Sequence, residues 1–167
     1  MLYCDTRQQE GKHAHVDRWL GAHNVAFEYR KLDFGDYMTE TSNISVDTKR
    51  DVQEVANNVG RAHARFVREC ERAAAAGCRL VVLVEEHPEY NDRGRLAGWT
   101  NRVCLRCQWR RYCTHGCERF RARPIQGATV AKIMATLEER HGVRFEFCRR
   151  GDTARRICEL LGVDYER

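Results

Sequence analysis

Two aspartates and a lysine in the first third of the chain have a spacing that could support phosphodiester hydrolysis. Asp36 follows Gly35, and Asp47 and Lys49 come after a strand-length gap. Side chains two residues apart on a strand leave the same face, so Asp47 and Lys49 are expected to point together. Carboxylates at the ends of two hairpin strands can share Mg²⁺ or Mn²⁺, both of which prefer oxygen ligands. Lys49 can then orient a water or stabilise charge in the transition state.

These residues form the predicted active site. Asp36 and Asp47 are the expected metal ligands, Lys49 is the expected catalytic cation, and Asp5, which ends the first predicted strand, could enter the same cleft. The alternative is a surface strand whose acid and base both face solvent, because the pattern D-x-K is weak when taken alone.

Four cysteines within fourteen residues form a second group with chemical potential. Their spacing is C-x2-C-x5-C-x3-C, and they are Cys104, Cys107, Cys113 and Cys117. Four thiolates at such spacing suit a closed tetrahedral zinc site, in which His115 could replace one cysteine. An iron–sulfur cluster and an unmetallated loop are the alternatives. The other cysteines occur in apolar patterns and are expected in the core: Cys4, Cys70, Cys78, Cys148 and Cys158.

Positive charge is concentrated around these four cysteines. Seven arginines between positions 102 and 123 face a single acid, Glu118, whereas the rest of the chain is close to neutral within a net charge of +5. With Trp109 and Tyr112 among them, these arginines could contact DNA phosphates and stack on bases. The alternative is a solvated charged surface. The predicted DNA-binding residues are Arg102, Arg106, Arg110, Arg111, Arg119, Arg121 and Arg123.

Length and composition indicate an ordinary globular domain. The chain has 167 residues, of which 43% are hydrophobic, and its longest apolar run, residues 80–84, is far too short to span a membrane. Met1 is followed directly by a strand-like segment, so no export leader is expected. Nine cysteines without such a leader favour the cytoplasm and metal ligation over disulfides.

Hydrophobic periodicity predicts an α/β fold with helices on both faces of a sheet. One domain, residues 1–167, contains an insert at 100–123 that lies within an aperiodic stretch, 86–126. A single helix is expected over 51–77, and Asp152 is expected to cap the last helix. The other expected strands and helices lie at 2–5, 16–20, 25–32, 37–39, 44–49, 80–84, 130–137, 143–147 and 154–161.

The motifs together resemble the XPF-type nuclease domain of the PD-(D/E)XK superfamily, and more narrowly its stand-alone versions from phages and prophages. The resemblance rests on Asp5-Thr6-Arg7-Gln8, Gly35-Asp36, Asp47-Thr48-Lys49, Arg65-Phe66, Leu83-Val84-Glu85 and the segment Gly-Val-Arg-Phe-Glu-Phe-Cys at 142–148. It implies a restriction-endonuclease-like central mixed β-sheet flanked by helices. It also implies a metal-dependent endonuclease that acts on branched or flapped DNA in a bacterial or phage-infected cell, and it allows a homodimer.

The sequence departs from the family pattern at several positions. Asp47 replaces a glutamate, Thr48 an arginine, Gln8 a glutamate and Gln53 an aspartate, although Asp51 is nearby. A catalytically inactive subunit that binds DNA or a partner is therefore the alternative function, and a zinc-knuckle adaptor is a third.

Arg7 and the cysteine insert also bear on the resemblance. Arg7 could simply pair with the carboxylates of the cleft. The cysteine insert is not part of the XPF-type pattern, although its first three cysteines are similar to those of iron–sulfur nucleases in the RecB-like branch of the superfamily.

Overall fold

The computed structural model describes residues 1–7, 11–60, 62–113, 117 and 124–166. Arg119, Arg121 and Arg123 lie outside the described residues, as do Gln8 and His115. Within the described part, six strands form one mixed sheet in the order β2-β1-β3-β4-β5-β6. The strands are β1 (Leu2–Asp5), β2 (Phe27–Arg30), β3 (Tyr37–Thr39), β4 (Ile44–Lys49), β5 (Arg79–Glu85) and β6 (Arg144–Cys148).

The sheet consists of two parallel blocks joined by an antiparallel strand. β1 pairs with β2 in parallel, and β4, β5 and β6 form the second parallel block. β3 lies between the blocks and is antiparallel to both β1 and β4, with Tyr37 opposite Val46. The predicted hairpin of β3 and β4 is therefore confirmed, but the expectation that its strands are half-buried is wrong for β4, which is buried on both faces.

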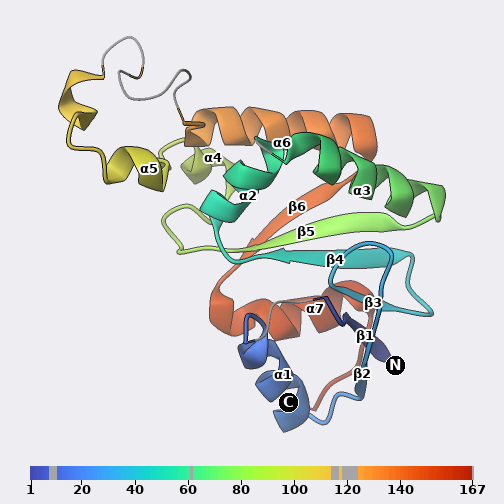
Figure 1. Ribbon diagram of the computed structural model, residues 1–167. Coiled ribbons are helices and arrows are strands. Elements are labelled where there is room, and N and C mark those ends of the chain that lie inside the picture. Colours follow the sequence, from blue (N-terminus) through green and yellow to red (C-terminus); the bar gives the residue numbers. More distant parts are fainter. Residues whose placement is uncertain (8–10, 61, 114–116, 118–123, 167) are drawn as a thin grey trace.

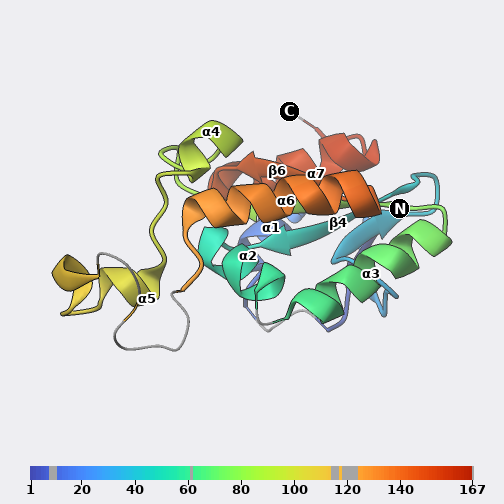
Figure 2. The ribbon, with the colours of Figure 1, turned by 90° about the horizontal axis from the view of Figure 1, so that it is seen from above.

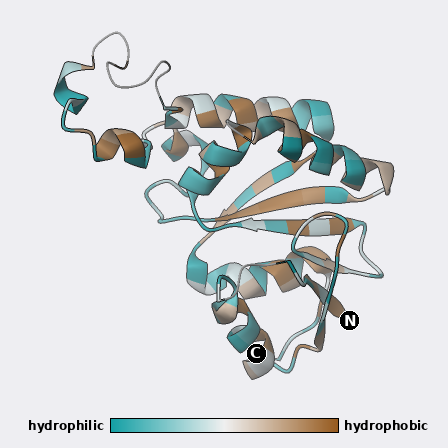
Figure 3. Ribbon diagram, in the orientation of Figure 1, coloured by the Kyte–Doolittle hydropathy of each residue, from teal (hydrophilic) through white to brown (hydrophobic). Residues whose placement is uncertain are grey.

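Helices cover both faces of the sheet (Figure 1). One face carries α2 (Val52–Val59), α3 (His63–Ala75) and α6 (Gly127–His141). The other carries α1 (Ala14–Ala22) and α7 (Thr153–Leu161). Each layer has its own buried cluster: Val82 packs with the first group of helices, and Leu83 packs with the second. Because successive side chains of β5 enter opposite layers, its middle, residues 80–84, is apolar on both faces, and most of the strand is brown in Figure 3.

The helix expected over 51–77 is wrong as a single element. α2 ends before Gly60, whose backbone angles (φ −95°, ψ −95°) are not helical, and α3 starts at His63. A side chain at position 60 would lie 2.8 Å from both the carbonyl of Ala56 and the side chain of Ile125. Glycine therefore lets the chain bend where Ile125 packs against it.

Two smaller expectations also need correction. β2 is shorter than the predicted strand over 25–32. Asp152 occupies the N-cap position of α7, but its carboxylate pairs with Arg155 at 3.1 Å rather than with the backbone of the helix.

The aperiodic stretch contains the short elements α4 (Arg93–Leu96), α5 (Arg102–Leu105) and the 3₁₀ turn η1 (Arg110–Tyr112). α4 packs against α6 and buries Leu96 in the core, whereas α5 and η1 extend away from the sheet (Figures 1 and 2). The base of the insert is closed by hydrogen bonds from Asn101 Nδ2 to the carbonyl of Ile125 (3.1 Å) and from Gly127 N to the carbonyl of Trp99 (2.9 Å). Within the part of the chain that the structure describes, no helix is long and apolar enough to cross a membrane.

Candidate functional site

A glycine turn positions Asp36 beside strand β4. Gly35 has a φ of +67°, and a side chain there would overlap the hydroxyl of Ser45. Only glycine adopts this left-handed conformation without steric cost, so it is suited to both the turn and the close approach. The backbone N–H of Asp36 then donates to the carbonyl of Val46 at 2.8 Å.

The carboxylate of Asp36 accepts hydrogen bonds from the part of β4 that β3 does not reach. Its Oδ2 accepts hydrogen bonds from the backbone N–H of Thr48 (2.9 Å) and from the Thr48 hydroxyl (2.6 Å). β3 begins at Tyr37, opposite Val46, so on this edge of β4 the pairing with β3 stops short of Thr48. The side chain of Asp36 thus acts as a local substitute for a strand partner.

Asp47 and Lys49 leave the same face of β4, as expected, and they form an ion pair. Lys49 Nζ donates to Asp47 Oδ1 and lies within ion-pair distance of Oδ2, which accepts no hydrogen bond. Both residues are buried, with exposed fractions of 5% and 8%. Electrostatic interactions in such a site are stronger than at the surface, because little water screens them.

Glu69 brings a third carboxylate to this site from helix α3. Its Oε1 accepts a hydrogen bond from the backbone N–H of Gly35 at 3.1 Å. Glu69 was not predicted to belong to the site from the sequence alone. A signal was present, however, since Glu69 follows the buried Phe66 by three residues and therefore lies beside it on the helix. We call Asp36, Asp47, Lys49 and Glu69 the acidic centre.

The acidic centre perturbs the titration of its own members. Burial raises the pKa of Asp47 to about 7; the Lys49 ammonium opposes this shift, and the negative charges of Asp36 and Glu69 add to it. Burial lowers the pKa of Lys49, but the charges of Asp47 and Asp36 outweigh this effect and raise it overall. Lys49 is paired with Asp47, and the charges of Asp36 and Glu69 also act on Asp47, so carboxylates outnumber the ammonium among these four residues.

Asp5 lies next to the acidic centre but has its own partners. Its backbone N–H donates to the carbonyl of Asp36 at 2.8 Å, which places the two residues side by side. Its carboxylate accepts from Arg7 Nε (3.0 Å) and from the backbone N–H of Leu32 (3.2 Å). The pairing of Arg7 with a carboxylate is therefore confirmed, and Asp5 holds Arg7 and the 30–33 segment together.

The carboxylate oxygens of the acidic centre are the type of ligand that a hard cation such as Mg²⁺ prefers. In this structure, however, they contact other protein groups. Asp36 Oδ2 contacts Thr48, and Asp47 contacts Lys49. Among the described residues, no three His, Cys, Asp or Glu side chains are grouped closely enough to hold a metal ion together. Sharing a cation would therefore require these side chains to reorient.

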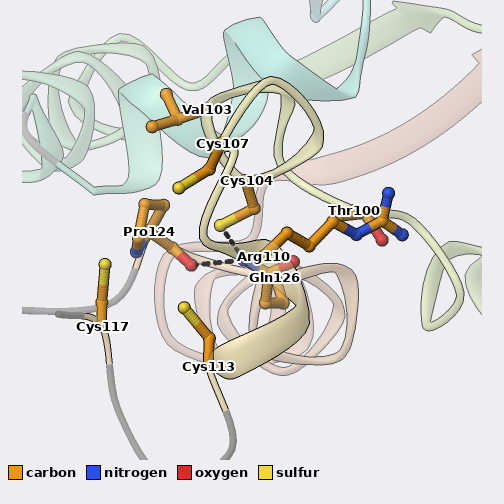
Figure 4. A pocket seen from close by; sticks show the side chains of 9 residues that line it. All are labelled: Thr100, Val103, Cys104, Cys107, Arg110, Cys113, Cys117, Pro124 and Gln126. Carbon is orange, nitrogen blue, oxygen red and sulfur yellow. Dashed lines mark hydrogen bonds between the residues drawn. The ribbon is translucent and has the colours of Figure 1, made fainter. Parts of the chain in front are cut away.

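The four cysteines of the insert line one pocket of about 180 Å³ (Figure 4). Cys104 lies in α5, Cys107 lies between α5 and η1, and Cys113 and Cys117 follow η1. Their sulfurs face the shared space. Gln126 Nε2 donates to Cys104 Sγ at 3.2 Å, and Cys113 Sγ donates to the carbonyl of Trp109 at 3.6 Å. The local spacing thus brings the four thiols to one pocket, but they lie farther apart than the ligands of a bound metal ion.

The described arginines of the insert fall into two groups. Arg106, Arg110 and Arg111 are exposed, beside Trp109 and Tyr112, whose exposed fractions are 52% and 67%. Arg102, also predicted to bind DNA, instead pairs with Asp51 at 2.9 Å, and its backbone N–H donates to Gln53 Oε1 at 2.8 Å. Asp51 caps α2, so Arg102 joins the insert to the end of β4.

The protein therefore has an α/β fold, an acidic centre at a strand hairpin, and an insert with a pocket lined by thiols. No protein-family model matches the chain, and no curated protein matches it significantly. The geometry of the two sites is therefore the basis for a functional proposal.

Proposed function

We propose that this protein is a divalent-metal-dependent DNA endonuclease of the XPF type with a restriction-endonuclease-like fold. The observation that carries the proposal is the excess of carboxylates in the acidic centre. Asp47 and Lys49 form a buried ion pair at the end of β4, and the charges of Asp36, directly before β3, and of Glu69, from α3, both act on Asp47. A dication such as Mg²⁺ or Mn²⁺ would neutralise this excess, and its preferred ligands are carboxylate oxygens and water.

Each residue has a distinct role in this proposal. Asp36 and Asp47 hold the cation, and Glu69 contributes charge and fixes the Gly35 turn through its hydrogen bond. Lys49 exchanges its partner Asp47 for the substrate, where its ammonium can stabilise the developing charge on a phosphate oxygen. The metal supplies Lewis-acid activation of the phosphate and of a water molecule. Asp5 holds Arg7 beside the site.

DNA binding is proposed to involve the insert. Arg106, Arg110 and Arg111 provide exposed charge, and Trp109 and Tyr112 provide exposed rings at a centroid distance of 6.2 Å. Charge and stacking surfaces of this kind suit DNA whose bases are partly unpaired. A preference for branched or flapped DNA follows from the family resemblance, as does a homodimer.

We also propose that the cysteine pocket binds one zinc ion, with an iron–sulfur cluster as the alternative. All four thiols line the same cavity, and Gln126 donates a hydrogen bond to one sulfur. A donor beside a thiolate ligand is a common supporting interaction at metal sites.

The alternative function is a catalytically inactive DNA-binding subunit, and burial of the central ion pair favours it. An active nuclease must expose Asp47 and Lys49 to its substrate, yet both side chains are almost fully covered. In an inactive subunit, the ion pair between Asp47 and Lys49 would stay buried and would not contact DNA.

A cleavage assay separates the two functions. Labelled single-stranded, duplex, flap and four-way DNA would be incubated with the protein in Mg²⁺, in Mn²⁺ and in a chelator. The matched variants are Asp47→Asn with Lys49→Met, which neutralises the pair, and Asp33→Asn, which removes an exposed carboxylate nearby. We expect metal-dependent cleavage by the wild type and by Asp33→Asn, and none by the double variant. Binding without cleavage in all samples would support the inactive subunit.

A further inference from the structure

A second basic surface lies at the carboxyl ends of β4, β5 and β6. These strands end on the same side of the molecule, which is also the side from which the insert projects (Figure 1). A cleft of about 570 Å³ opens there. Four arginines line it, and they are Arg50, Arg102, Arg149 and Arg150. We call it the strand-end cleft.

The four arginines come from three distant parts of the chain. Arg50 follows β4, Arg102 belongs to the insert, and Arg149 and Arg150 follow β6, where Arg150 begins the 3₁₀ turn η2 (Arg150–Asp152). Sequence reasoning gave a role to Arg102 alone, because the others are far apart in sequence. Only the parallel arrangement of the three strands brings them to one edge.

The acidic residues of the cleft are engaged in structural contacts. Asp51 caps α2 by accepting from Glu54 N at 2.8 Å, and Glu86 accepts from the backbone N–H of Val52 at 2.9 Å. Glu85 lies within 2.7 Å of His15 Nε2 and accepts from Thr153 Oγ1 at 2.9 Å. Carboxylates held in this way neutralise the arginines only in part.

The arginines are correspondingly available to an external anion. Arg150 lies 3.9 Å from Glu85, at the limit of an ion pair, and Arg50 lies 3.5 Å from Asp51. The side chains of both are 63% exposed, and Arg149 is also exposed. Guanidinium groups bind phosphate oxygens through paired hydrogen bonds. Several guanidinium groups spread over an open cleft suit a chain of phosphate groups better than a single anion.

We propose that the strand-end cleft binds consecutive phosphate groups of one nucleic-acid strand. This inference rests on the proposed function and identifies where its substrate runs. Arg50 directly follows Lys49, and Arg102 connects the cleft to the insert. A strand in the cleft would therefore pass from the insert toward the acidic centre.

The test compares two double variants that remove the same charge. Arg149→Gln with Arg150→Gln alters the cleft, whereas Arg18→Gln with Arg140→Gln removes two exposed arginines from α1 and α6. Binding of labelled single-stranded and flap DNA is measured in a chelator, over a range of salt concentrations. Thermal unfolding shows that both variants are folded, which is expected because Glu85 retains His15 and Thr153 as partners.

We expect the cleft variant alone to bind DNA more weakly. Each lost phosphate contact lowers the slope of log K against log salt by about 0.7 to 0.9, so the loss of two contacts should reduce the slope by about 1.5. Equal weakening in both variants would mean that only net charge matters and would overturn the proposal. Competition by polyglutamate as strong as that by DNA, or by a nucleoside triphosphate or inorganic phosphate at similar concentration, would overturn it as well.

The outcome for the cleft is distinguishable from the outcome for catalysis. Selective loss of binding in a protein that never cleaves DNA would support the cleft and refute the endonuclease. Normal binding by the cleft variant of an active nuclease would refute the cleft and leave the endonuclease in place.

Discussion

Lys49 and Asp47 depend on each other because both are buried. Removing one partner leaves an uncompensated charge, which costs about 3–5 kcal/mol of stability, whereas neutralising both partners with groups of similar shape costs far less. We therefore expect Lys49→Met alone to lower the free energy of unfolding more than Lys49→Met combined with Asp47→Asn. Urea unfolding of the three proteins measures this difference. A double variant as unstable as the single one would show that the pair is not coupled.

The pH dependence of stability should also reflect Asp47. Burial raises its pKa to about 7, above about 3.9 in the unfolded chain. Between these values the folded state binds more protons, so the stabilising contribution of Asp47 is fully present below about pH 4 and is lost as the pH rises through about 7. The raised pKa of Lys49 has its effect only at higher pH.

This contribution can be isolated by comparison with Asp47→Asn in a chelator. We expect the stability of the wild type relative to the variant to fall between about pH 5 and about pH 8, by at most about 1.4 kcal/mol per unit. A difference that stays constant over this range would contradict the raised pKa.

Gly35 should be essential for the position of Asp36. In Gly35→Ala, the left-handed conformation costs about 1 kcal/mol, and the overlap with Ser45 adds to this cost. Gly142 is the matched control, because its φ is +66° and open space surrounds it. We expect Gly35→Ala to destabilise the protein more than Gly142→Ala and to abolish any cleavage, as measured by thermal unfolding and the DNA assay. Equal destabilisation by the two substitutions would show that the close approach of Ser45 to Gly35 does not matter.

At the scale of elements, local patterns predicted the strands better than the long helix. The period-two geometry of a strand correctly placed Asp47 and Lys49 on one face, although β4 is buried on both faces and not on one alone. The break at Gly60 depends on Ile125, which is distant in sequence, and so could not be read from the helical pattern. The strand-end cleft was missed for the same reason, since tertiary packing alone brings its groups together, whereas Glu69 could have been suspected from its position beside the buried Phe66.

The insert should depend on metal more than the sheet does. Thiolate ligation would make metal binding part of local folding, so a chelator should increase hydrogen exchange at residues 101–113 and leave β4 and β5 protected. Elemental analysis of protein prepared without chelator should find about one zinc per chain, or iron with sulfide if the alternative holds. Cys104→Ser should reproduce the effect of the chelator, whereas Cys78→Ser, outside the insert, should keep the metal. A metal-free insert with unchanged exchange would refute both versions.

At the scale of the whole molecule, strand β4 connects the proposed catalytic and binding surfaces. Asp47 and Lys49 lie in its last three positions, Arg50 follows in the strand-end cleft, and Asp51 holds Arg102 of the insert. Ligands of open α/β sheets commonly bind beyond the carboxyl ends of parallel strands, which is where this cleft opens. A substrate bound there would reach both the acidic centre and the insert.

Mg²⁺ should therefore stabilise the folded protein through the acidic centre. A ligand that binds only the folded state adds about 2.7 kcal/mol at a concentration of about 100 times its Kd. The gain should be larger near pH 8 than near pH 5.5, at about the same ionic strength, because the carboxylates must be ionised to bind the cation. Thermal unfolding with Mg²⁺, with K⁺ as the control, measures the effect. Asp47→Asn with Lys49→Met should not respond, and an equal response from this variant would place the cation elsewhere in the protein.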